Sequence, residues 1–107
     1  MTVRTKQDAA KVLSNIEGDK RFYCNDGCVI GNLQQLAECL THMSDCYFGY
    51  HVTSEKNDFS RWISDVLGDN KLARDVSHAL NRLEASEIVK ARVTWLQKKA
   101  EKLEAQG

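Results

Sequence analysis

Proline is absent from the sequence, and no apolar run approaches the roughly 18 residues that a membrane-spanning helix requires. The 15 basic and 15 acidic residues cancel, so the chain lacks the basic footprint of most nucleic-acid-binding proteins. Its first residues also lack the apolar stretch of a secretory signal peptide. We therefore expect a cytoplasmic protein without a membrane span, and the composition does not favour nucleic acid as a partner.

The chain also lacks any low-complexity tract that would divide its 107 residues. Hydrophobic residues make up 42% of the sequence, which is enough for one modest core. We predict a single domain over residues 1–107. Its fold class is mainly α, a compact bundle of five or six helices with one small β-hairpin at about residues 21–30.

No paired zinc-binding pattern of the C-x-x-C kind is present, although the chain contains four cysteines. A disulfide framework is not expected, because a reducing cytosol keeps thiols reduced. Cysteine thiols are often buried, so we interpret these residues as small core side chains. A bound zinc ion is the alternative, since His42 or His51 could complete a partial cysteine set. Its ligands would then come from Cys24, Cys28, Cys39, Cys46 and His51.

In residues 21–30 the apolar residues do not follow the helical spacing seen in the surrounding chain. Two β-prone triplets, Phe22–Cys24 and Cys28–Ile30, flank the turn sequence Asn25–Gly27. A two-stranded hairpin is only marginally stable alone. We therefore expect this hairpin to lie on the helices.

Apolar residues at helical spacing predict helices on both sides of the hairpin. The first spans about residues 6–17, because Thr5 and Asp8 form a capping pattern before it and Gly18 would end it. Asn32 caps a second helix. Its core face consists of Leu33, Leu36, Ala37, Leu40 and Met43.

The stretch from Tyr50 to Asp69 is the most informative part of the sequence. Its apolar residues follow a helical period, and Gly68 is a natural end for the helix. Asn57 and Asp58 are both competent caps for its start, and Asp69 can cap the next helix. On such a helix one strip beside the apolar face would contain Asp58, Trp62, Asp65 and Asp69.

Two further helices are expected after this stretch. The last and longest covers about residues 84–105, with a nearly heptad-spaced seam from Val89 to Leu103. A second apolar edge of the same helix consists of Ile88, Ala91 and Trp95. Both edges must be buried, either inside the bundle or against a partner, and a homodimer through this helix is one such arrangement. The helix before it would present Leu72, Ala73, Val76, Ala79 and Leu80 on one face.

A pattern of the form H-V-x-x-E-K-N-D-F-x-x-W occupies residues 51–62. With flanking positions, it resembles a small prokaryotic domain family of unknown function, found alone or appended to other domains. The resemblance covers residues 22–73, about half of the chain, and implies a shared fold there without an assigned activity. The cysteines are not part of its pattern. The flanking matches are Phe22, Gly27, Leu33, Leu36, Ala37, Leu40, Met43, Ser44, Asp45, Val66, Gly68, Asp69, Leu72 and Ala73.

A polar cluster in this stretch supplies the candidate site residues. A histidine near a carboxylate and an ammonium can perform acid–base chemistry or bind an anionic group. The same residues can instead be structural, with the histidine bonded to a carboxylate beneath Trp62. We favour the structural interpretation and predict no catalytic residue, because no nucleophile motif or phosphate-binding loop accompanies the cluster. The candidate binding residues are His51, Lys56, Asn57, Asp58, Trp62 and Tyr50.

These observations favour a non-catalytic binding or adaptor domain that contacts another protein, with no cofactor. Exposed aromatic residues would be its anchors, since aromatics dominate binding hot spots. One alternative is a nucleic-acid-associated protein that uses the basic residues of the last helix, although glutamates interleave with them. The other is a small metal-dependent sensor or enzyme that uses His51 and the cysteines. The candidate anchors are Tyr47, Tyr50, Trp62 and Trp95.

Overall fold

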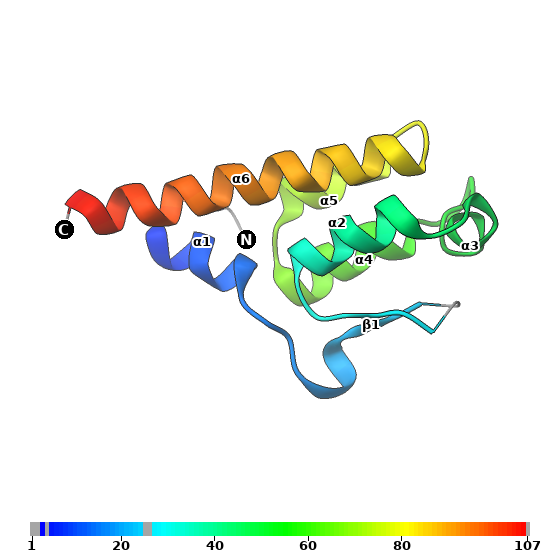
Figure 1. The fold of residues 1–107 in the computed structure, drawn as a ribbon, viewed down its shortest axis with the longest axis horizontal. Helices are drawn as coiled ribbons and strands as arrows, with labels where there is room; N and C mark the ends of the chain where they lie inside the picture. The colour runs from blue at the N-terminus through cyan, green and yellow to red at the C-terminus, as the bar shows by residue number, and fades with distance from the viewer. Residues whose placement is uncertain (1–2, 4, 25–26, 107) are drawn as a thin grey trace.

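The computed structural model describes residues 3, 5–24 and 27–106, with side chains up to residue 101. This part of the chain contains six α-helices and one two-stranded antiparallel hairpin, which confirms the predicted fold class (Figure 1). In chain order the elements are the helix α1 (Lys6–Leu13), the 3-10 turn η1 (Gly18–Lys20), the strands β1 (Phe22–Tyr23) and β2 (Val29–Ile30), the helices α2 (Leu33–His42), α3 (Asp45–His51) and α4 (Asp58–Trp62), the π-helical segment η2 (Ile63–Leu67), and the helices α5 (Asn70–Ser77) and α6 (Arg82–Gln106).

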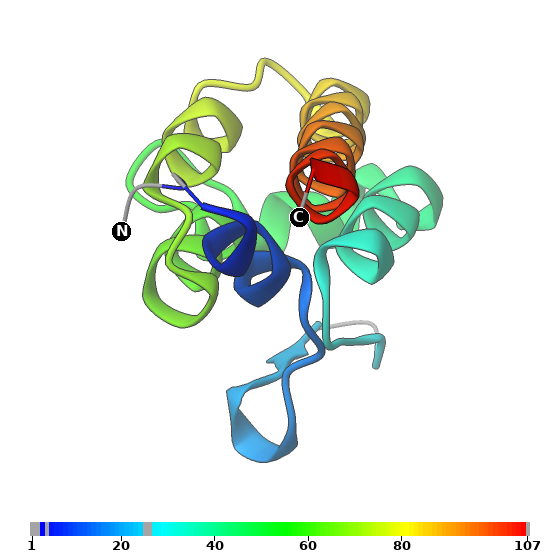
Figure 2. The same cartoon turned by 90° about the vertical axis from the view of Figure 1, so that its left-hand side faces the viewer.

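The long helix α6 runs along the longest dimension of the molecule, and α1, α2 and α5 pack against it (Figures 1 and 2). Both α1 and α2 contact α6, and its seam residues Val89, Val93 and Leu96 are buried there. The surface that we considered for a homodimer is therefore occupied inside the chain. The side chain of Leu103, at the end of the predicted seam, lies outside the described residues. Within the described ranges, no helix combines the length and apolar character needed to cross a membrane.

Side-chain caps fix the starts of the helices, as the sequence predicts. Thr5 and Asp8 form a reciprocal capping box at α1, and Asn32 caps α2. Asn57 rather than Asp58 caps α4, because its side-chain oxygen accepts the amide hydrogen of Ser60 at 3.0 Å. The first helix ends at Leu13 instead of residue 17. There the backbone turns to an extended conformation and leads into η1.

The hairpin lies on the helices as expected. Phe22 of β1 pairs with Ile30 of β2, and the ring of Phe22 stacks on Phe59 of α4 with centroids 4.9 Å apart. Gly27 has a φ of 89°, a left-handed conformation that suits glycine in a turn. The predicted turn residues Asn25 and Asp26 lie outside the described residues.

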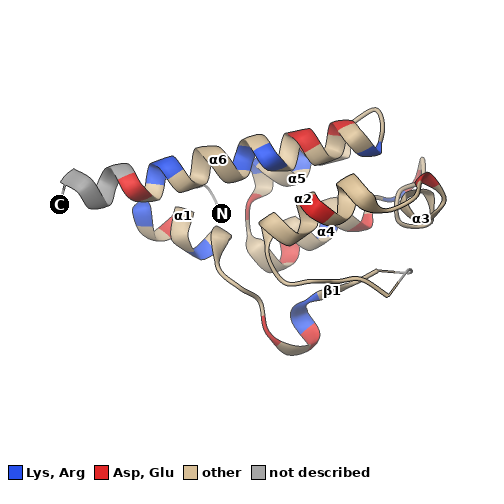
Figure 3. Cartoon of the chain, viewed as in Figure 1, with Lys and Arg blue, Asp and Glu red and all other residues tan. Residues whose placement is uncertain are grey.

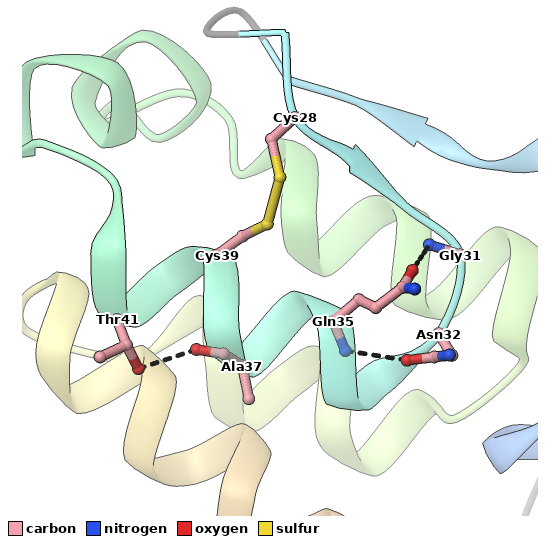
Figure 4. The surroundings of a disulfide bond; sticks show 7 residues. All are labelled: Cys28, Gly31, Asn32, Gln35, Ala37, Cys39 and Thr41. Carbon is pink, nitrogen blue, oxygen red and sulfur yellow. Dashed lines mark hydrogen bonds between the residues drawn. A yellow bond between two sulfur atoms is a disulfide. The ribbon is translucent and has the colours of Figure 1, made fainter.

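A disulfide joins Cys28, just before β2, to Cys39 of α2 (Figure 4). This corrects the expectation that all four cysteines are reduced core residues. Cys24 is buried as predicted, whereas Cys46 is exposed on α3. On the same side of α2, the Gln35 side chain accepts a hydrogen bond from the Gly31 amide at 2.7 Å. The hairpin is therefore attached to α2 by a covalent bond and a hydrogen bond.

The central helix predicted from Phe59 is formed by α4 and η2, and its last turn is wider than an α-helical turn. The Gly68 amide donates to the carbonyl of Ile63 at 2.8 Å, an i→i+5 bond, and Gly68 has a left-handed φ of 78°. The acids of the predicted strip are engaged separately. Each of its acids faces a different cation: Asp58 pairs with Lys56, Asp65 with Arg61, and Asp69 with Arg92.

The helix α5 ends at Ser77, earlier than its apolar pattern suggests. Leu72, Ala73 and Val76 are buried as predicted, but Leu80 lies in the following loop and is 85% exposed. The prediction that Leu80 belongs to the core face is therefore wrong. His78, in the turn after α5, is exposed.

Candidate functional site

The polar cluster singled out in the sequence is assembled where α3 meets the start of α4. His51 is the last residue of α3 and is 5% exposed, with its Nδ1 3.1 Å from Oδ2 of Asp58. An ionised carboxylate only accepts hydrogen bonds, so Nδ1 carries the hydrogen. The ammonium of Lys56 lies 3.0 Å from the same oxygen. The predicted contact between His51 and a carboxylate is confirmed.

Asp58 holds the negative charge of this cluster. Partial burial raises the pKa of Asp58, but hydrogen bonds from His51 and Lys56, together with their charges, outweigh burial and lower it below the ordinary 3.8. The carboxylate is therefore ionised at neutral pH. Since Lys56 balances this charge locally, the cluster presents little net charge to an anionic ligand.

Aromatic rings enclose the imidazole of His51. Phe22, Tyr50 and Phe59 approach it edge-on, with ring centroids 5.0 to 5.3 Å away. Tyr50 is exposed on its outer side, and Lys56 lies 5.5 Å from the Tyr50 ring centroid. This packing joins the hairpin, α3 and α4 around one buried polar group, an arrangement typical of a structural network.

Trp62 is not an exposed anchor. It is 7% exposed, and its Nε1–H donates to the carbonyl of Lys20 at 2.8 Å. This bond joins α4 to η1. Trp62 is therefore not the partly exposed side chain that the sequence led us to expect, and its side chain contacts Lys20 and the ring of Phe22.

A second region, absent from the predicted site, lies between α5 and α6, and we call it the α5–α6 groove. It consists of two adjoining hollows of about 580 and 480 Å³ that share Arg92 and Trp95. The first is mainly basic and the second is lined by apolar and acidic side chains. Besides the shared pair, the first is lined by Val3, Asp69, Asn70, Lys71 and Arg74, and the second by Leu72, Asp75, His78, Glu84, Ile88 and Ala91.

A buried ion pair forms the floor of this groove. The guanidinium of Arg92 donates two hydrogen bonds to Asp69, at 2.8 and 3.0 Å, and Asp69 is almost fully buried. Asp69 also caps α5 by accepting the amide hydrogen of Leu72 at 3.2 Å. A bidentate pair of this kind fixes both partners geometrically. Arg92 is therefore held in place before any ligand arrives.

Trp95 lies above this pair and is 44% exposed. Its ring has Arg92 on one side, with the guanidinium carbon 4.4 Å from the centroid, and the ammonium of Lys99 5.3 Å away. Cations over an indole face are attracted by its quadrupole. The result is an exposed aromatic surface between two positive charges.

The charges of α6 change along its length. Figure 3 shows a basic segment at the very start of α6, acidic segments next to it, basic segments in its middle and beyond, and one more acidic segment before the grey part. The acids in the described part of α6 include Glu84 and Glu87, and the bases include Lys90, Arg92, Lys98 and Lys99. The groove therefore has a basic end at α5's first turn and an acidic end at the start of α6.

The cysteines and His51 do not come together as one metal site. His51 is engaged by Asp58, and Cys46 is exposed on α3, while Cys28 and Cys39 are bonded to each other. Over the described ranges, no group of three or more His, Cys, Asp or Glu side chains is arranged to hold a metal ion. The predicted set of Cys24, Cys28, Cys39, Cys46 and His51 is not assembled.

No protein-family model, curated protein or solved structure that was compared with the chain matches it. The resemblance based on residues 22–73 therefore stays a prediction.

Proposed function

We propose that this chain is a non-catalytic domain that binds another protein, and that the α5–α6 groove receives an acidic segment of that partner. One observation carries the proposal: the half-exposed Trp95, held between Arg92 and Lys99 at the junction of two hollows. Tryptophan and arginine are the residues most enriched in binding hot spots. A cytoplasmic location, expected from the sequence, belongs to the same proposal.

Charge complementarity favours an acidic partner segment. Lys71, Arg74 and Arg92 line the first hollow against one acid, Asp69, whose charge Arg92 neutralises. Lys71 pairs with Asp75 at 2.9 Å, but both side chains are exposed, and such surface pairs exchange partners at little cost. Carboxylates of a partner would therefore meet Lys71 and Arg74. This electrostatic match mainly supplies specificity and a fast association rate.

The second hollow supplies the apolar contact. Ile88 and Ala91 of α6 and Leu72 of α5 line it next to Trp95. An apolar side chain of the partner would pack there, while neighbouring acidic residues reach the basic hollow. Asp75 and Glu84 at this end repel the unbroken row of phosphates of a nucleic acid strand, whereas a peptide can place an uncharged residue there.

The histidine cluster supports a binding role rather than a catalytic one. His51 is enclosed by aromatic rings and its carboxylate partner is balanced by Lys56. A general acid or base must lie within hydrogen-bonding reach of a substrate proton. The buried position of His51 suits the support of α3 and α4 instead.

A peptide-display selection against the intact chain tests the proposal. We expect the recovered peptides to combine several Asp or Glu residues with one apolar or aromatic residue. Binding of a recovered peptide, followed by fluorescence anisotropy, should weaken at least tenfold in Trp95→Ala and in Arg74→Glu, roughly 1.4 kcal/mol or more. Tyr50→Ala removes an exposed aromatic residue outside the groove and should leave the affinity unchanged.

Two results would contradict the proposal. Peptides without acidic enrichment, or peptides that bind Trp95→Ala as tightly as the wild type, would show that the groove is not the binding surface. Tighter binding of a single-stranded oligonucleotide, lost in Trp95→Ala and steeply dependent on salt, would identify a nucleic acid site instead.

A further inference from the structure

Two cysteines and a histidine line one hollow where the hairpin lies on α2. None of the residues that line this hollow also lines the α5–α6 groove. The disulfide joins Cys28 to Cys39 (Figure 4). His42 lies three residues after Cys39 on α2, so the two project from neighbouring positions on one side of the helix. Together with Cys28 they line a hollow of about 320 Å³.

Cys24 joins this group through the register of the hairpin. The pairs Phe22–Ile30 and Tyr23–Val29 lie opposite each other, and the Cys24 amide donates to the Cys28 carbonyl at 2.8 Å, which continues the same register. Opposite residues project from the same face of a strand pair, with Cβ atoms about 4.5–5.5 Å apart. Cys24 is 8% exposed, so this face is the one turned toward the helices.

We propose that the reduced chain binds one zinc ion through Cys24, Cys28, Cys39 and His42. Three thiolates and one imidazole form a tetrahedral set that Zn²⁺ prefers in structural sites. The spacing supplies one pair of ligands from a hairpin, C-x3-C, and one pair from a single helical turn, C-x2-H. None of these four residues lines the α5–α6 groove, so the zinc site does not depend on the proposed protein partner.

The disulfide and the metal exclude each other. A dithiol reductant of the thioredoxin class would transfer two electrons to the Cys28–Cys39 bond; its own two thiols form a disulfide, and each released cysteine sulfur takes up a proton. Zinc then displaces the protons of the three thiols, and His42 binds through a neutral ring nitrogen. While the disulfide is intact, two of the four donors are unavailable to a metal ion.

The other residues that could bind zinc are less suitable as ligands. Cys46 is exposed on α3, and His51 is held by Asp58 within its aromatic enclosure. Glu38 also lines the hollow, but a carboxylate is a harder donor than a thiolate and is disfavoured for zinc when thiolates are available. Cys24 is therefore assigned as the fourth ligand.

A metal titration of the intact chain tests this site. Protein reduced with a phosphine, kept anaerobic and free of chelator, is titrated with Co²⁺ and then Zn²⁺. We expect one equivalent of Co²⁺ with the absorption of tetrahedral thiolate coordination, its displacement by Zn²⁺, and one zinc per chain in native mass spectrometry. Protein oxidised with diamide should bind neither ion at this site.

Matched variants assign the ligands. Cys24→Ser, Cys39→Ser and His42→Ala should each weaken zinc binding at least tenfold, whereas Cys46→Ser and His78→Ala should not change it. His42 is exposed, so His42→Ala keeps the fold, which circular dichroism checks. The proposal is overturned if the reduced protein binds no metal, or if the control variants lose as much affinity as the ligand variants. Loss of binding in Glu38→Gln with full binding in Cys24→Ser would overturn the assignment of Cys24.

Discussion

The histidine cluster and the α5–α6 groove contain the same kinds of groups but use them differently. Each has a carboxylate, basic side chains and an aromatic ring. In the cluster, His51 and Lys56 both bind Asp58, and aromatic rings enclose the imidazole. In the groove, Arg92 is fixed by Asp69 while Trp95 stays half-exposed beside it. The exposed indole beside a fixed cation leaves a surface for a ligand, whereas the enclosed imidazole of His51 leaves none and only Tyr50, at the edge of the cluster, is exposed.

Within the groove itself, some residues hold the two helices together and others face the space that a ligand would occupy. Asp69 and Arg92 hold α5 against α6, while Arg74, Lys71 and Trp95 face the hollow. Substitutions of the first pair should therefore change stability. Substitutions of the second set should change binding.

The largest expected effect is that of Asp69→Ala. This change leaves the guanidinium of Arg92 without its buried carboxylate and also removes the cap of α5. Breaking a buried ion pair from one side costs about 3–5 kcal/mol. Urea unfolding should show this loss, whereas Asp65→Ala, which breaks an exposed pair with Arg61, should stay within about 0.5 kcal/mol. Equal losses in both variants would show that the Arg92 pair does not support the groove.

Asp58→Ala should have the next largest effect. It removes the hydrogen bonds from His51 and Lys56 but not the cap of α4, which Asn57 provides. Hydrogen bonds to charged groups contribute about 1.5–3 kcal/mol, and that is the loss expected in urea unfolding. Glu55→Ala, an exposed acid in the preceding turn, is the control. A loss no larger than that of the control would mean that the cluster does not stabilise the fold.

A smaller effect should appear in the dependence of stability on pH. The pKa of Asp58 is lowered in the folded chain, so its stabilising contribution is complete above the ordinary value of 3.8 and is lost as pH falls through the lower folded value. The difference in unfolding free energy between the wild type and Asp58→Asn should therefore shrink in acid. A gap for Asp58→Asn that widens below pH of about 4 would contradict the lowered pKa.

The smallest effect on stability is expected for Trp95→Ala. The ring is half-exposed, and surface substitutions of this kind usually change the unfolding free energy by less than about 1 kcal/mol. The same substitution should abolish binding of the selected acidic peptides. A large loss of stability would mean that Trp95 supports the fold, and the groove would then lose its proposed contact residue.

The sequence predicts the local features of this fold well. Thr5, Asn32 and Asp69 cap their helices because a cap depends on residues only two or three positions apart. The hairpin is also formed by residues close in the sequence. His51 and Asp58 are separated by seven positions, which is still a short distance along the chain. Each of these contacts joins residues close in the sequence, which is why the contact of His51 with a carboxylate could be predicted.

Long-range contacts were not predictable in this way. Asp69 and Arg92 lie 23 positions apart, and no local pattern joins them. Periodicity also predicts a buried seam on α6 without stating whether α1, α2 or a second copy covers it. One local signal for the groove was present: Arg92 and Lys99 lie three before and four after Trp95, on the same helical side. The apolar spacing of Trp95 with Ile88 and Ala91 predicted a buried ring, whereas the two neighbouring cations are consistent with the exposed ring that is observed.

The π-helical turn η2 makes the α5–α6 groove unusually sensitive to the number of residues in the chain. Each α-helical residue rotates the chain by about 100°. Deleting a single residue between Ile63 and Leu67 would convert the π-helical turn into an α-helical turn. The residues that follow, Asp69 and α5 included, would be rotated relative to α4. Asp69 would then point away from Arg92. Related chains could exchange many side chains in this segment, but an insertion or deletion of one residue there would dismantle the groove.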